Sequence, residues 1–238
     1  MLTQTTDAMG HKVWLLLAAG PALFLVAIIL ASVFLSMRGV NPEQIAQRMP
    51  LLMPHILFGA LLCLGVLAIF SLDLTSIWVV PDPKKMLVDV AIGVLAGVVL
   101  AVTYFKWLAP LLETAQRGIG DYVPAGTVLP TIGNNLGLFF IANVLLAPLV
   151  EETIYRGYAL PLLVKQVGAT GAVLITCVFF GLLHWLGGFW YMLLTAVVAG
   201  AVFAGLALWR EAIHAPFAAH FALNVIEFFY VWRAHNSS

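Results

Sequence analysis

The sequence predicts an all-α membrane protein, a polytopic bundle of transmembrane helices. Hydrophobic residues make up 63% of the 238 residues and charged residues 9%, whereas about 25% of residues are charged in a typical soluble domain. The mean hydropathy is +1.04. A helix needs about 20 mostly apolar residues to cross a bilayer, and apolar runs of that length recur along the chain. The expected partner of these surfaces is the lipid bilayer, and the zero net charge gives no indication of nucleic-acid binding.

About seven spans are expected, and about six to eight fit the pattern. They cover residues 13–36, 51–72, 87–112, 136–163, 169–186, 189–209 and 213–232. Lys and Arg are nearly balanced on alternate sides, so the positive-inside rule does not decide the orientation. We expect an integral, multi-pass protein of the plasma membrane if prokaryotic, or of the endoplasmic reticulum if eukaryotic. The polar stretch 113–135 is expected to form an interfacial loop that caps or gates a cavity.

The fourth predicted span contains three charged residues, Glu151, Glu152 and Arg156. Each charge near a bilayer centre costs roughly 2.5–3.5 kcal/mol on insertion scales, so this cluster requires an explanation. Glu152 and Arg156 are four residues apart, with the acid first, which is the favourable order for an ion pair on a helix. Glu151 lies about 100° further round the helix and has no such partner. Pro148 predicts a kink that opens space beside it.

Further polar side chains occur in the last predicted spans. His184 follows Phe180 by one helical turn, and His220 and Asn224 lie one turn apart on one face, which Glu227 extends. Taken singly, a buried histidine or asparagine is more often a packing residue that hydrogen-bonds between helices. Burying all of them separately would be costly. We therefore expect them to converge on one wet cavity, since ionisable groups inside membranes are usually functional.

These residue types together fit the hydrolysis of an amide bond. A carboxylate beside a neutral imidazole can take a proton from water, which predicts water activation by Glu151 with His184. An imidazole N–H and an amide NH₂ can stabilise the oxyanion that forms, which predicts that role for His220 and Asn224. Glu152 with Arg156 would hold the geometry and the charge balance of the site.

The order Glu151-Glu152-x-x-x-Arg156, Phe180-x-x-x-His184, His220-x-x-x-Asn224 resembles the CAAX protease and bacteriocin-processing (CPBP) family of intramembrane proteases. The resemblance covers about residues 143–230. It implies a helical membrane fold and an endopeptidase that cuts near the C-terminus of a lipidated protein or within a membrane-associated peptide. It assigns water activation to Glu151 and His184, the oxyanion to His220 and Asn224, and supporting roles to Glu152, Arg156 and Phe180. We expect one membrane domain, 1–238, with spans without motifs in 1–135 and the catalytic core in 136–232.

Two questions stay open at this level. The zinc-protease pattern HExxH is absent, but Glu151, His184 and His220 could still bind one divalent metal such as zinc; a metal-independent glutamate mechanism is the preferred reading. The alternative function is a non-proteolytic membrane scaffold or bacteriocin-immunity protein that binds a membrane-protein partner. A proton-coupled transporter is disfavoured, because the polar residues crowd one half of the chain and no inverted repeat is evident.

Overall fold

A computed structural model describes residues 2–79, 82–123 and 135–236. Within these ranges the chain is helical throughout, without a strand, which confirms the all-α prediction. The longest helices are α1 (Leu2–Met37), α2 (Pro42–Ser71), α4 (Pro83–Thr103), α9 (Leu160–Leu183) and α12 (His214–Asn236). The shorter helices are α3 (Leu74–Trp78), α5 (Ala109–Gly118), α7 (Leu136–Phe139), α8 (Ala147–Glu152), α10 (Phe189–Leu194) and α11 (Ala201–Arg210).

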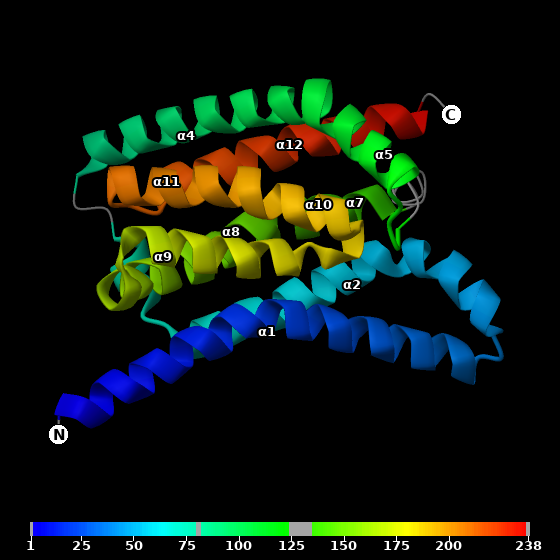
Figure 1. Ribbon diagram of the computed structural model, residues 1–238, viewed down its shortest axis with the longest axis horizontal. Helices are drawn as coiled ribbons and strands as arrows, with labels where there is room; N and C mark the ends of the chain where they lie inside the picture. Colours follow the sequence, from blue (N-terminus) through cyan, green and yellow to red (C-terminus); the bar gives the residue numbers. More distant parts are fainter. Residues whose placement is uncertain (1, 80–81, 124–134, 237–238) are drawn as a thin grey trace.

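The helices form a bundle with their axes roughly aligned (Figure 1). Helices α4 and α12 pack side by side along one side of the bundle, and α1 and α2 pair along the other. The segments from α7 to α11 lie between these two pairs, so the motif-bearing part of the chain occupies the middle of the bundle. The core is correspondingly apolar and contains residues from nearly every long helix.

Five helical stretches in the described part of the chain are long and apolar enough to cross a membrane: Gly10–Met37, Gln47–Ser71, Pro83–Gly118, Leu136–Leu183 and Phe189–Arg210. The fourth contains two of the predicted spans, and the last predicted span is α12. This helix is absent from the five because its polar residues, His220, Asn224 and Glu227 among them, lower its hydropathy. The chain is an integral membrane protein, and the count of about seven spans stays a prediction.

Gly168 explains how two predicted spans come to share one helical stretch. Its backbone has φ 75° and ψ 169°, values far from those of a helix, within the range of α9. A side chain strongly disfavours a positive φ, so glycine suits this position. The chain reverses there, and the rest of α9 packs back against the π-helical segment Thr153–Ala159. The predicted spans 136–163 and 169–186 are thus two arms of one helical hairpin.

Within the described residues four segments are π-helical: Tyr104–Leu108, Phe140–Leu146, Thr153–Ala159 and Thr195–Gly200. Each of the first three ends two residues before a proline, namely Pro110, Pro148 and Pro161. A proline donates no backbone hydrogen bond and clashes with the carbonyl four residues back, and the wider π turn accommodates both defects. At Pro148, where a kink was predicted, the helix therefore has a π-helical segment, Phe140–Leu146, just before the proline.

Two glycines allow α4 to approach α12 closely. A Cβ atom built on Gly93 would lie 2.2 Å from the carbonyl oxygen of Ala215, and one built on Gly97 would lie 2.2 Å from that of Ala219. Small residues four apart are a common solution for close helix packing in membranes. This crossing holds α12 in place, and α12 carries His220 and Asn224.

Candidate active site

Glu152 is the centre of a buried charge cluster. Its side chain and that of Arg156 have no exposed surface, and Arg156 Nη1 lies 3.1 Å from Glu152 Oε1. The ion pair predicted from their spacing is therefore present. The same oxygen accepts a hydrogen bond from His220 Nδ1 at 2.9 Å, a link between distant spans that the sequence did not reveal. Arg156 also donates from Nη2 to the carbonyl oxygen of Gly200 at 3.1 Å.

The aromatic rings of Phe180 and Phe203 frame this cluster. The Arg156 guanidinium carbon lies 4.2 Å from the centroid of the Phe180 ring, a cation–π distance. Phe203 stacks on the His220 imidazole with 4.9 Å between centroids and 21° between the planes. Phe180 thus contacts the cluster, and its supporting role stays a prediction, while Phe203 is a second ring in contact with the cluster that sequence reasoning missed. Phe203 lies on α11, and only its contact with His220 in the folded chain shows that it is part of the site.

Glu151 contrasts with its neighbour. It is 3% exposed, and its Oε2 atom has no hydrogen-bond partner among the residues that the structure describes. Its side chain lines a cavity that also contains His184 and His220. Burial of a carboxylate without a compensating partner is unfavourable for stability. Oε2 of Glu152 and Nε of Arg156 also lack a partner among the described residues, but both side chains are held through their other atoms, and no hydrogen bond of this kind holds Glu151.

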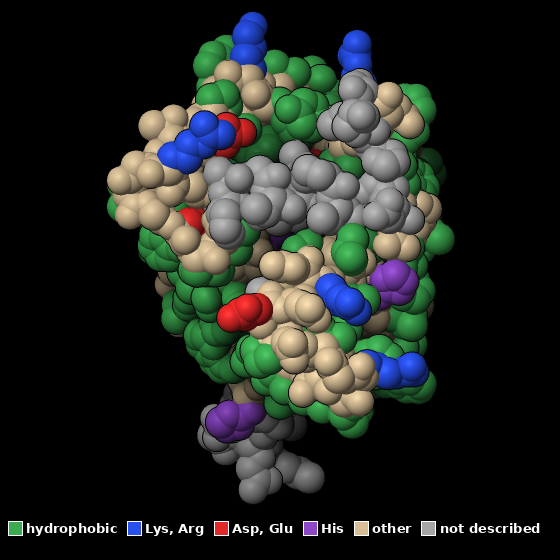
Figure 2. Space-filling view, turned by 90° about the vertical axis from the view of Figure 1, so that its right-hand side faces the viewer, with side chains coloured by type: hydrophobic (Ala, Val, Ile, Leu, Met, Phe, Trp, Pro, Cys, Tyr) green, Lys and Arg blue, Asp and Glu red, His purple; other side chains and the backbone are tan. Residues whose placement is uncertain are grey.

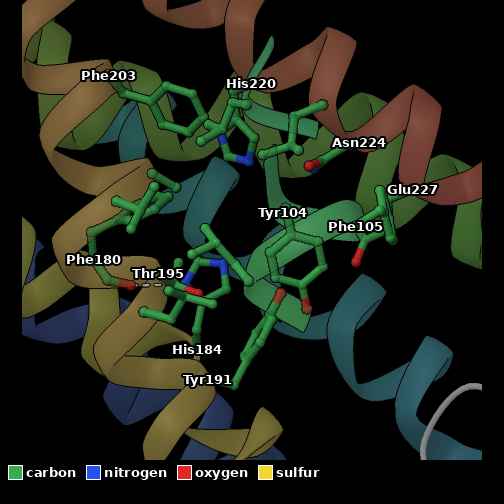
Figure 3. A pocket seen from close by; sticks show the side chains of 16 residues that line it. Tyr104, Phe105, Phe180, His184, Tyr191, Thr195, Phe203, His220, Asn224 and Glu227 are labelled. Atoms are coloured by element: carbon green, nitrogen blue, oxygen red, sulfur yellow. Dashed lines mark hydrogen bonds between the residues drawn. The ribbon is translucent and has the colours of Figure 1, made fainter. Parts of the chain in front are cut away.

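Each of the two histidines is held through its own Nδ1 atom. His184 Nδ1 lies 2.8 Å from the backbone oxygen of Phe180, and His220 Nδ1 bonds to Glu152. Both partners are acceptors, so Nδ1 must carry the proton on each ring. Nε2 is then the nitrogen left to the cavity that both rings line (Figure 3). On a neutral His184 it can accept a proton, and on His220 it can donate when the ring is protonated beside the Glu152 carboxylate.

Asn224 is fixed by a contact from the π-helical segment Phe140–Leu146. Its Nδ2 donates to the backbone oxygen of Asn143 at 2.7 Å. The Asn143 side chain in turn donates from Nδ2 to Glu227 Oε2 at 2.8 Å. Because the Asn143 carbonyl can only accept, the Asn224 amide orientation is determined, and one N–H of Nδ2 remains for a ligand. Neither Asn143 nor its link to Asn224 was recognised from the sequence as part of the site.

These residues surround a cavity of about 330 Å³. Four of the predicted site residues, Glu151, His184, His220 and Asn224, line it together. A smaller hollow of about 60 Å³ adjoins it. Phe180 and Phe203 are among the residues that line this hollow (Figure 3). Glu152 and Arg156 lie behind this wall.

The spans without motifs also build the cavity. Residues of α1, α2 and α5 and of the π-helical segment Tyr104–Leu108 line it, including Phe24, Leu57, Tyr104 and Gln116. Tyr191 of α10 completes the wall beside His184. The sequence offered no pattern for these contributions, because each is an ordinary apolar or aromatic residue whose role depends on its neighbours in space.

The chain after α5 is fastened to the start of α10. Asp121 accepts hydrogen bonds from the backbone N–H groups of Phe189 at 2.9 Å and Trp190 at 3.3 Å, and Trp190 Nε1 donates to the Gly120 oxygen at 2.9 Å. Partial burial tends to raise the pKa of Asp121, but these backbone hydrogen bonds outweigh it and lower the pKa below its usual value.

Gln116 and Val123, on either side of the Asp121 anchor, line the cavity, so the described part of the predicted loop reaches its edge. The remaining loop residues, 124–134, lie outside the described residues, and the gating role stays a prediction. Viewed from this end, the molecule shows scattered charged side chains and largely hydrophobic flanks (Figure 2).

A metal site does not assemble from these side chains. Within residues 2–79, 82–123 and 135–236, no three His, Cys, Asp or Glu side chains are arranged to hold a metal ion. The set Glu151, His184 and His220 considered from the sequence is therefore not preformed. Binding of one divalent metal such as zinc stays a prediction.

Comparison with known proteins finds a family match in this part of the chain. Residues 133–226 match the family model described as type II CAAX prenyl endopeptidase, Rce1-like. This part of the chain is similar to the CAAX protease family. The match contains all of the predicted site residues, from Glu151 to Asn224. No curated protein and no solved structure matched the chain. The CAAX proteases are peptidases, so the family supports peptidase activity on a peptide or prenylated protein in a membrane environment.

Proposed function

We propose that this protein is an intramembrane endopeptidase of the CAAX protease type that uses a carboxylate to activate water. The observation that carries the proposal is the convergence of Glu151, His184, His220 and Asn224 on one cavity. Their order in the chain matches the family, and their burial leaves few other reasons for so many polar groups at this depth.

In the proposed mechanism one proton of a water molecule passes to Glu151 and Nε2 of His184, which hold it between them. The resulting hydroxide attacks the substrate carbonyl carbon. The carbonyl oxygen becomes negative as the tetrahedral intermediate forms. The free N–H of Asn224 and Nε2–H of the protonated His220 donate to it. The proton held by Glu151 and His184 then passes to the amine as the C–N bond breaks.

Glu152 and Arg156 position this machinery rather than react. The Glu152 carboxylate fixes which nitrogen of His220 faces the cavity and supports its positive charge, and Arg156 neutralises Glu152. A third group that orients the imidazole is a recurring feature of acid–base sites.

The test is cleavage by the purified protein in detergent. Wild type and Glu151→Gln are compared on prenylated and unprenylated C-terminal peptides, with and without a strong chelator. We expect wild type to cut and the variant to lose about 100- to 10,000-fold in rate, as general bases contribute. We expect the chelator to leave the wild-type rate unchanged. Cutting at the wild-type rate by Glu151→Gln would overturn the mechanism, and loss of activity with chelator would establish a metal requirement.

A further inference from the structure

Glu227 is the polar residue of the cavity that the proposed mechanism does not use. It lies on α12, on the same face as His220 and Asn224. Asn143 holds its Oε2 atom, and no described residue donates to its other oxygen. It lines both the main cavity and the adjoining hollow, and Figure 3 shows its carboxylate directed into the interior near Tyr104. The family match ends at residue 226, one residue earlier.

Apart from His220, which is paired with Glu152, the charged residues that line the main cavity all have the same sign. They are Glu113 at its edge, Glu151 and Glu227, and neither Lys nor Arg occurs among its described lining residues. Residues 124–134 contain no Lys, Arg, Asp or Glu, so they add no charge. Arg156 is committed to Glu152 behind the wall. Clefts lined by one sign of charge concentrate ligands of the opposite sign, so this cavity favours a cationic group.

The neighbours of Glu227 in the cavity are suited to a cation. Tyr104, Phe105 and Tyr191 line the same hollow, and aromatic rings attract ammonium and guanidinium groups through their faces. An apolar ligand group at this point would leave the free oxygen of Glu227 buried without a donor, which is unfavourable. A Lys or Arg side chain would satisfy that oxygen and place its aliphatic stem along the apolar wall.

We propose that Glu227 forms a subsite for a Lys or Arg side chain of the peptide substrate, beside the groups that cleave it. The proposal rests on the endopeptidase function and adds a preference for basic residues near the scissile bond. Asn143 has a supporting role, because its amide holds one carboxylate oxygen and leaves the other directed to the substrate.

The test uses the panel peptide that wild type cuts fastest. It is N-acetylated, so that no terminal ammonium competes, and carries Lys, norleucine or Glu at each position flanking the scissile bond. At one of these positions we expect kcat/KM to be at least about tenfold higher with Lys than with norleucine, and lowest with Glu. In Glu227→Gln, which keeps an oxygen for Asn143 but removes the charge, this Lys-to-norleucine ratio should fall to within about twofold of unity.

A binding measurement separates the charge of Glu227 from that of Glu151. Binding of fluorescently labelled peptides to the non-cleaving Glu151→Gln variant is measured by fluorescence anisotropy. The affinity should show the same preference for Lys over norleucine, and adding Glu227→Gln should remove that preference. Glu211→Gln is the matched control, because Glu211 is exposed and lies outside the cavity, and its ratio should equal that of wild type.

The possible failures are distinct. Efficient cleavage without any preference for Lys at any position, or a preference that survives Glu227→Gln, overturns the subsite and leaves the endopeptidase. Failure of wild type to cut any peptide overturns the proposed function and the subsite with it.

Discussion

Substitution of Glu by Gln should have different effects on stability at the adjacent positions Glu151 and Glu152. Replacing Glu by Gln keeps the shape of the side chain and removes its charge. Oε1 of Glu152 accepts hydrogen bonds from Arg156 and His220. Oε2 of both glutamates lacks a partner in the described part of the chain, and no described residue donates a hydrogen bond to Glu151. The charge of Glu152 is therefore structural, and that of Glu151 is not.

The expected magnitude follows from these contacts. Glu152→Gln leaves Arg156 in a fully buried position without a counter-charge, and breaking a buried ion pair in this way costs about 3–5 kcal/mol. The glutamine oxygen can still accept one hydrogen bond, so we expect the lower end, about 3 kcal/mol. For a chain of this length 1 kcal/mol corresponds to about 2–4 °C in the unfolding temperature, so the loss should be about 6–12 °C. Glu151→Gln should shift it by less than about 3 °C.

The assay is thermal unfolding of the purified variants in one detergent, at one scan rate, followed by tryptophan fluorescence. Glu43→Gln, an exposed position in the first turn of α2, is the control and should match wild type. Cleavage is measured on the same samples. We expect Glu151→Gln to be stable and inactive. A fall in unfolding temperature as large for Glu151→Gln as for Glu152→Gln would refute the division of roles between the two glutamates.

Two further predictions concern packing and the fastened loop. Gly97→Ala should lower the unfolding temperature by several degrees, since its Cβ would meet the Ala219 oxygen at 2.2 Å and overpacking costs about 1–3 kcal/mol. Gly59→Ala is the control and should leave the unfolding temperature unchanged, because its Cβ would have nothing within 4 Å. Equal shifts for the two variants would contradict the packing argument. Asp121→Asn should raise the rate of trypsin cleavage after the exposed Arg117 about 3- to 10-fold by weakening the anchor to α10. Because the pKa of Asp121 is lowered in the folded protein, the stability that wild type gains over this variant should be constant at neutral pH and disappear as the pH falls below the usual value near 3.8. A difference that grows on acidification would show that the carboxylate does not anchor the loop.

Local spacing predicted much of the site because a helix converts sequence separation into direction. The four-residue spacing of Glu152 and Arg156 predicted an ion pair, and the structure has it at 3.1 Å. The same spacing placed His220 and Asn224 on one face, and both line the cavity. The π-helical turn before Pro148 also has a local cause, the missing backbone donor.

Contacts between residues of distant spans could not be predicted from the sequence. The bond from His220 to Glu152 and the bond from Asn224 to Asn143 join residues 68 and 81 positions apart, and no pattern in one chain marks such pairs. The reversal at Gly168 was likewise hidden, since a glycine in an apolar run is compatible with a straight helix.

Hydropathy and helical periodicity are local properties, so they were enough to predict a helical membrane protein and to single out the ionisable residues whose burial needs a reason. The packing of the helices was needed to show which of those residues meet, which ring nitrogen of each histidine faces the cavity, and that Arg156 and His220 bond to Glu152 and not to Glu151. The physical reason is that hydrogen bonds and charge pairing act over a few ångströms in space, and only the packing of the helices brings those atoms within reach.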